Sequence, residues 1–251
     1  MNYNNFLTNF IFLDKINEFN AKLKTAIRNL FGLFYPKICA TCTKVLLNYE
    51  EILCFSCSVD LPITNFTKIK ENKAEKSFYG RVPIMAVTSL LYFNKRGKVQ
   101  KLIHQLKYKN QQQIGQFLGD WLGEEIIESK RFENIDCIIP VPLHPKKLKK
   151  RGYNQVITFG ESLSKKLKIP LIENKLIRIS KSYTQTFKNR FDRWKSVEEI
   201  FELSDKDFFE NKHILLIDDV ITTGATLEAC CLQLMQTKNI KISIATMVIT
   251  E

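Results

Sequence analysis

The chain has 251 residues, enough for one large domain or for one domain with a small appendage. Its 45% hydrophobic and 25% charged residues are typical of a globular protein, and no stretch reaches the ~18 uninterrupted apolar residues of a membrane-spanning helix. The 38 Lys and Arg outnumber the 26 Asp and Glu, and the resulting net charge of +12 favours nucleic acid, phosphorylated metabolites or a membrane surface as partners without choosing among them. The N-terminus has no basic residue before its apolar part, unlike a signal peptide, so we expect a cytoplasmic protein.

Residues 1–35 predict a helical segment. Between Phe19 and Phe34, apolar residues recur at spacings of three and four, with Lys and Arg on the other side. Such a helix packs on its own domain or, because its polar face is basic, lies on a membrane surface or a partner. Pro36 ends this segment.

Four of the seven cysteines form two closely spaced pairs, with the pattern C-x2-C, eleven residues, C-x2-C. An odd total with two such pairs indicates a metal in a reducing compartment rather than a disulfide framework. Two tight turns, each carrying two thiolates, complete a tetrahedron and predict a structural zinc site in a module over residues 36–63. Iron or a redox dithiol is the alternative. The expected zinc ligands are Cys39, Cys42, Cys54 and Cys57.

The remainder of the chain divides into a polar, lysine-rich stretch at 64–79, expected to be a linker, and a domain over 80–251. Within the domain, apolar runs alternate with amphipathic segments, which predicts a parallel sheet with helices on both faces. The strands are expected at 86–93, 137–143, 213–218 and 242–249, and the helices at 98–108, 114–127, 154–167 and about 226–236.

An acidic pair, Asp218 and Asp219, follows the apolar run at 214–217 and precedes the threonine-rich turn Thr222–Thr226. In a parallel sheet such a position lies where ligands bind, beyond the carboxyl end of a strand. The following helix start offers free amides and a positive dipole end for a phosphate, and the acids suit sugar hydroxyls or a Mg²⁺ ion. The pattern is neither a Walker loop nor a dinucleotide-binding fingerprint. The alternative is a capped helix after a core strand, with its acids in solvent.

A basic stretch follows the strand expected at 137–143, and it predicts a cationic loop from His144 to Arg151. Next to a phosphate cradle, such a loop suits pyrophosphate or a nucleic acid backbone, with Arg151 as the main contact and Lys147 and Lys150 as helpers. A solvated basic surface is the alternative. Lys107, Tyr108 and Lys109 give a weaker signal of the same kind, and His104 is expected to be structural.

Three segments carry a resemblance to known families. "LLIDDVITTGATL" (Leu215–Leu227) resembles the phosphoribosyl pyrophosphate signature of type I phosphoribosyltransferases. "IIPVPLHPKKLKKRGYNQ" (Ile138–Gln155) resembles the ComF family, which is linked to DNA uptake in competent bacteria and also carries an N-terminal zinc ribbon. "RISKSYTQTFKNRFDRW" (Arg178–Trp194) resembles the mobile hood of that family, in which a glutamine and an arginine recur, here Gln185 and Arg193.

The resemblance implies a type I phosphoribosyltransferase-like fold with a small N-terminal zinc ribbon and helix. It implies a protein that binds phosphoribosyl pyrophosphate or a related phosphorylated ribose with Mg²⁺, as a phosphoribosyltransferase whose acceptor is unknown. The alternative is a non-catalytic single-stranded DNA-binding or ligand-sensing protein of the uptake machinery, with a competence helicase as partner. The implied ribose and phosphate contacts are Asp218, Asp219, Val220, Thr222, Thr223, Gly224, Ala225 and Thr226, and the pyrophosphate and lid contacts are Lys147, Lys150, Arg151, Gln185 and Arg193.

Overall fold

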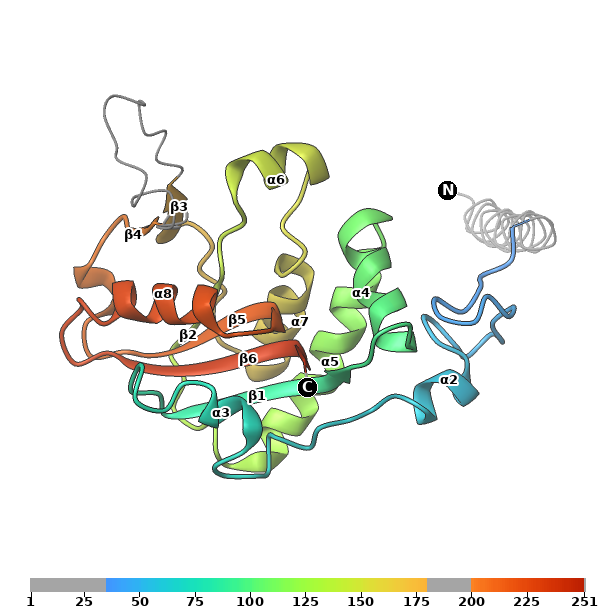
Figure 1. The fold of residues 1–251 in the computed structure, drawn as a ribbon, viewed down its shortest axis with the longest axis horizontal. Helices are drawn as coiled ribbons and strands as arrows, with labels where there is room; N and C mark the ends of the chain where they lie inside the picture. Colours follow the sequence, from blue (N-terminus) through green and yellow to red (C-terminus); the bar gives the residue numbers. More distant parts are fainter. Residues whose placement is uncertain (1–34, 180–199, 251) are drawn as a thin grey trace, which may run out of the picture. The chain divides into compact units, whose positions relative to one another are not determined.

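The computed structural model describes residues 35–179 and 200–250, which belong to two compact units divided after Ser58 (Figure 1). The helix predicted for residues 1–35 lies outside the described residues, apart from Tyr35. In the part of the chain that is described, no helix is both long and apolar enough to cross a bilayer.

The described part of the first unit, from Tyr35 onward, contains two turns and one short helix. An antiparallel bridge between Ile38 and Val45 closes the first turn, where Thr43 takes a positive φ of 64°. The second turn leads into α2 (Phe55–Val59), and the Cys57 amide donates to the Cys54 carbonyl at 2.9 Å.

The second unit contains a four-stranded parallel sheet, as the sequence predicts. Its strand order is β1-β6-β5-β2. β5 and β6 occupy the centre, and most of their residues are buried because helices cover both faces of the sheet. The strands are β1 (Ala86–Phe93), β2 (Cys137–Pro140), β5 (His213–Ile221) and β6 (Lys241–Thr250).

The two faces of β5 identify the helices that cover the sheet. Ile214 and Leu216 share a core cluster with Leu227 of α8 (Ala225–Leu234), so α8 covers one face. Ile217 points to the opposite face, where its side chain lies next to Gly160 of α7 (Ile157–Leu167). On that second face α7 packs closely on α5, through glycines that admit the neighbouring helix. The other helices of the unit are α3 (Lys73–Lys76), α4 (Lys98–Tyr108) and α5 (Gln113–Ser129).

The stretch 64–79 differs from the linker expected there. Phe66, Ala74 and Phe78 are buried in the same core cluster as Leu227, while the lysines between them stay exposed. The side-chain amide of Asn72 donates to three carbonyls and its oxygen caps α3. The apolar residues are too widely spaced among lysines to register as an amphipathic element, which is why the sequence pattern suggested a linker.

The strand expected at 137–143 and the loop expected at 144–151 also differ from the structure. β2 stops at Pro140, and α6 (Pro145–Arg151) replaces the loop. Proline is favoured at the first position of a helix, the His144 side chain accepts from the Lys146 amide, and Gly152 ends α6 with a φ of 84°. None of the seven residues of α6 is buried, so the basic side chains of this helix face solvent.

A separate antiparallel pair joins β3 (Leu176–Ile179) to β4 (Ile200–Leu203), followed by a 3₁₀ turn at Asp207–Phe209. The segment that resembles a hood begins in β3 at Arg178. Its remaining part from residue 180, including Gln185 and Arg193, lies outside the described residues.

Candidate functional site

A cavity of about 880 Å³ opens in the second unit beyond the ends of β2 and β5. Its formation follows from the unequal lengths of these strands. The pairing of β2 with β5 ends at Pro140 and Ile217, with a last hydrogen bond of 2.9 Å from the Val141 amide to the Ile217 carbonyl. From Asp218 onward, β5 continues beside β6 alone in the described sheet, so the acids border the space that β2 has left. Both lie inside β5, which runs on to Ile221, rather than at its end as the sequence suggested.

Asp219 is held on the face of the sheet that α4 and α7 cover. Its side chain is 8% exposed, and its Oδ1 accepts from Lys107 Nζ at 2.9 Å. The side-chain amide of Gln155 donates to the other oxygen, Oδ2. Each carboxylate oxygen of Asp219 therefore already has a hydrogen-bond partner in the protein, and the partner of Oδ1 is a cation.

Asp218 points to the opposite face of the strand, because successive side chains of a strand alternate. It is partly exposed and borders the cavity, and its Oδ1 accepts from the Asp219 amide at 2.8 Å. Burial and the neighbouring Asp219 carboxylate raise the pKa of Asp218 to about 8, against the weaker influence of Lys107 and Arg178. The two acids of the pair thus have different environments: Asp219 is paired with a lysine, whereas Asp218 has no cationic hydrogen-bond partner among the described residues.

The threonine turn leads directly into α8, as the sequence predicts. Gly224 caps the helix with a φ of 75°, a conformation that other residues rarely take. Arg81 holds the outside of the turn: it donates to the Thr223 carbonyl at 2.8 Å and pairs with Glu228 of α8. The turn borders the cavity through Thr222 and Thr226.

Basic side chains line the same cavity as the acids and form its basic wall. Lys147, Lys150 and Arg151 of α6 contribute to it, together with Lys107 and Lys109 at the end of α4. Arg178 of β3 adds a further cation. The Arg151 guanidinium lies 5.4 Å from the ring centroid of Tyr108 and also donates to the side-chain oxygen of Gln155. The cavity therefore combines carboxylates, a helix start and a cluster of cations, which suits a ligand with both hydroxyl and phosphate groups.

The structure brings together most residues that the sequence singled out, and adds several that it did not. Thr223, Gly224 and Ala225 belong to the turn without bordering the cavity, and Gln185 and Arg193 lie outside the described residues. Sequence reasoning missed Gln155 and Arg81. Gln155 had one weak signal, its place at the end of the segment that resembles the ComF family, and Arg81 had none. The expected residues that border the cavity are Lys147, Lys150, Arg151, Asp218, Asp219, Val220, Thr222 and Thr226.

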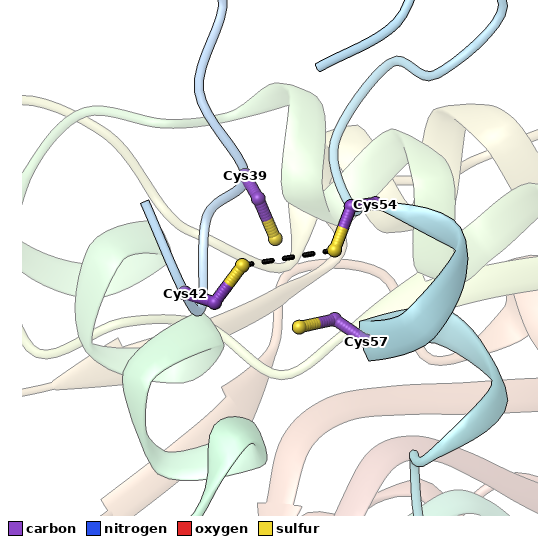
Figure 2. A group of neighbouring side chains, drawn as sticks. All are labelled: Cys39, Cys42, Cys54 and Cys57. Carbon is purple, nitrogen blue, oxygen red and sulfur yellow. Dashed lines mark hydrogen bonds between the residues drawn. The ribbon is translucent and has the colours of Figure 1, made fainter. Parts of the chain in front are cut away.

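The four cysteines of the first unit converge on one point (Figure 2). Their sulfur atoms all lie within 4.8 Å of one another, and the sulfurs of Cys42 and Cys54 are 3.6 Å apart. Zinc–sulfur bonds of ~2.3 Å in a tetrahedron need neighbouring sulfurs about 3.8 Å apart, so the cluster fits such a metal ion. Burial opposes ionisation of the Cys39 thiol, but hydrogen bonds from Thr41 and from backbone amides lower its pKa to about 5. These thiols form a group that could bind a metal such as zinc.

Comparison with known proteins shows what the second unit resembles. Residues 155–250 match the family model of the phosphoribosyl transferase domain. This range contains α7, β5, the threonine turn and α8, so the family match covers the acid side of the cavity. Together with the parallel sheet covered by helices on both faces, it shows a phosphoribosyltransferase-like fold.

Two relatives with similar sequences have names that refer to competence and DNA utilization. The chain is 36% identical to Competence protein F of Haemophilus influenzae over 130 residues, which are 50% of this chain and 57% of that protein. It is 30% identical to the DNA utilization protein YhgH of Escherichia coli K12 over 129 residues, 50% of this chain and 56% of that one. These matches confirm the resemblance to the ComF family. The chain spans somewhat more than half the length of the relatives that it matches.

Solved structures resemble the chain only loosely. Adenine phosphoribosyltransferase from Leishmania tarentolae aligns with a TM-score of 0.34 and 16% identity, covering 55% of this chain and 71% of that one. Purine phosphoribosyltransferase from Pyrococcus horikoshii aligns with a TM-score of 0.32 and 19% identity, covering 63% and 77%. At such scores the alignments add nothing to the assignment, which rests on the family match and the sheet.

Proposed function

We propose that this protein binds phosphoribosyl pyrophosphate, or a closely related phosphorylated ribose, together with Mg²⁺. The observation that carries the proposal is the cavity of about 880 Å³, which is lined by Asp218, by the threonine turn and by the cations of α6 and α4. A ligand that bears one phosphate, a sugar and a pyrophosphate has groups for each of these surfaces.

The 5-phosphate is proposed to lie at the start of α8, where amides of the first helical turn and the hydroxyls of Thr222 and Thr226 donate to it. The ribose hydroxyls are proposed to donate to Asp218, which accepts from one backbone amide, whereas both oxygens of Asp219 already accept from side chains. Arg151, Lys147 and Lys150 are proposed to contact the pyrophosphate group, where charge accumulates if the bond to the sugar breaks.

Mg²⁺ fits this set of donors. The ion prefers oxygen ligands, usually one or two carboxylates together with phosphate oxygens and water. Asp218 offers a carboxyl group that borders the cavity and has no cationic hydrogen-bond partner among the described residues, and the charge of a bound Mg²⁺ ion would favour its ionised form. Bound Mg²⁺ would supply charge neutralisation for the phosphates, while the side chains of this chain orient the sugar.

Zinc is proposed to be structural in the first unit. Four thiolates leave no coordination position open for chemistry, and a metal that ties two turns together contributes folding free energy. Zinc content is checked by metal analysis of the purified chain.

For the physiological role, we propose a part in natural competence, in line with the names of the relatives, Competence protein F and DNA utilization protein. Transfer of the phosphoribosyl group to an acceptor is a further part of the proposal. A helicase partner likewise stays a prediction.

A second function, binding of single-stranded DNA or sensing of the ligand without catalysis, is favoured by α6. All of its residues are unburied, and five of its seven are Lys or Arg. Such a helix suits a nucleic acid backbone, and binding through it would weaken steeply as the salt concentration rises.

The decisive experiment is calorimetric titration of the protein with phosphoribosyl pyrophosphate in the presence and absence of Mg²⁺. We expect Mg²⁺-dependent binding that Asp218→Asn weakens at least tenfold, whereas Asp207→Asn, an exposed acid of the 3₁₀ turn, leaves it unchanged. Wild-type affinity in Asp218→Asn would contradict the proposed site. Release of pyrophosphate with candidate acceptors then separates a transferase from a sensor.

A further inference from the structure

One side chain, Gln155, joins the acidic and basic walls of the cavity. Its amide nitrogen Nε2 donates to Oδ2 of Asp219, and its oxygen Oε1 accepts from Nη1 of Arg151. The residue is 5% exposed, so water does not readily replace either contact. The four residues Lys107, Asp219, Gln155 and Arg151 therefore form one continuous series of polar contacts from α4 through β5 to the end of α6.

The chemistry of these contacts requires an amide. A glutamine side chain has a donor at one atom and an acceptor at another, and the charges of the partners fix which atom faces which partner. Asp219, an anion, receives the donor, and Arg151, a cation, receives the acceptor. A glutamate would place a second anion against Asp219, and a methionine would satisfy neither partner.

Neighbouring contacts hold Gln155 in this position. The Tyr153 hydroxyl donates to the Leu106 carbonyl of α4, and the Asn154 side chain donates to the Val141 carbonyl at 3.0 Å. The turn between α6 and α7 is thus attached on one side to α4 and on the other to the chain that leaves β2. These contacts fix the backbone on both sides of Gln155, so its side chain has a defined position between Arg151 and Asp219.

We infer that Gln155 is a positioning residue that couples the acidic wall to the basic wall, so that an anion on Arg151 and a sugar beside the acids bind cooperatively. This inference rests on the proposed function. Without a ligand, Gln155 keeps Arg151 turned toward Asp219 and fixes the orientation of that carboxylate. A ligand with a pyrophosphate group shares or takes over Arg151, which leaves the amide to Asp219. The cavity consequently binds ligands that carry both a sugar and a pyrophosphate group more tightly than ribose 5-phosphate, which lacks the pyrophosphate.

The test compares two ligands by calorimetry in Mg²⁺, phosphoribosyl pyrophosphate and ribose 5-phosphate. Gln155→Met is expected to weaken phosphoribosyl pyrophosphate binding about tenfold and ribose 5-phosphate binding less than threefold, because only the first ligand engages both walls. The matched control is Gln116→Met on the exposed face of α5, which keeps wild-type affinity for both ligands. Thermal melting shows that each variant is folded under the conditions of the titration.

A thermodynamic cycle with Arg151→Met then distinguishes coupling from a general structural role. If Gln155 acts through Arg151, the loss of phosphoribosyl pyrophosphate affinity in the double variant is smaller than the product of the two single losses. Gln155→Glu, which preserves size, is the second variant and is expected to lose at least as much affinity for this ligand as Gln155→Met. It takes the place of Gln155→Met if the methionine variant does not fold.

The outcomes distinguish failure of the proposed function from failure of the coupling through Gln155. A wild-type protein that binds neither ligand overturns the proposed function. Wild-type binding of phosphoribosyl pyrophosphate, with affinity within twofold in both folded Gln155 variants, overturns the coupling alone. Equal losses for the two ligands, or a double variant that shows the full product of the single losses, overturns it as well.

Discussion

Lys107 Nζ lies 2.9 Å from Oδ1 of Asp219, although 112 residues separate them in the chain. The contact joins the last turn of α4 to β5, and it neutralises one acid of a neighbouring pair. The other acid, Asp218, has no such partner among the described residues, and this asymmetry underlies several expected effects of substitution.

Lys107→Met is expected to lower the free energy of unfolding by about 3 kcal/mol. The substitution leaves the Asp219 carboxylate, which is 8% exposed, without its cationic partner. The figure is at the low end for a buried pair because the Lys107 side chain is itself 22% exposed. Urea unfolding measures the loss. Adding Asp219→Asn to the same chain should restore most of it, and a double variant as unstable as the single one would contradict the assignment.

Asp218→Asn is expected to change how stability depends on pH. Burial and the Asp219 carboxylate raise the pKa of Asp218 from 3.8 to about 8, so between these values the folded protein keeps a proton that the unfolded chain has released. The wild type therefore loses stability as the pH rises through this window, whereas an asparagine has no proton to lose. Urea unfolding at pH 5, 7 and 9 should show an advantage of the variant that grows with pH and levels off above about 8.

The control for that experiment is Asp207→Asn, an exposed acid of the 3₁₀ turn. It should follow the wild-type curve at all three pH values. An Asp218→Asn variant whose stability runs parallel to the wild type across this range would contradict the raised pKa.

Gly224→Ala is expected to destabilise the protein by about 2–3 kcal/mol. The backbone there has a φ of 75°, and an added Cβ would lie 3.2 Å from the ring of Phe78, which is 1% exposed and has little room to move. Gly152→Ala separates the two causes, because its φ is 84° and nothing lies within 4 Å of the added carbon. This control should lose only about 1 kcal/mol in urea unfolding. Equal losses in the two variants would show that Phe78 yields to the extra carbon.

Removal of metal is expected to affect the first unit alone. Zinc should be present at one ion per chain, and Cys39→Ser or Cys57→Ser should abolish it, whereas Cys137→Ala in β2 should retain it. Metal analysis and proteolysis after treatment with a chelator provide the measurement. Cleavage confined to residues before Val59, with the second unit intact, is the expected pattern. Full zinc content in Cys39→Ser would remove that residue from the site.

Local patterns accounted for much of this fold. The limits expected for β1 and α4 agree with the structure, because an apolar run and an amphipathic period of three to four are properties of neighbouring residues. Predictions failed where a short-range signal was absent or misleading. The exposed basic stretch after β2 contains a proline start and a glycine end, yet without an apolar face it gave no helical period, although it forms α6.

The sequence by itself determined the parallel sheet, the pairing of acids with a threonine turn and the two cysteine turns, because each depends on residue types at fixed spacing along the chain. Only the tertiary structure decided what the acids contact. Strand alternation sends Asp218 and Asp219 to opposite faces, and packing of α4 and α7 then brings Lys107 and Gln155 to Asp219 alone. Packing likewise brought Arg81 to the threonine turn from 142 residues away. Such contacts depend on how distant segments pack against one another, which no spacing between neighbouring residues records.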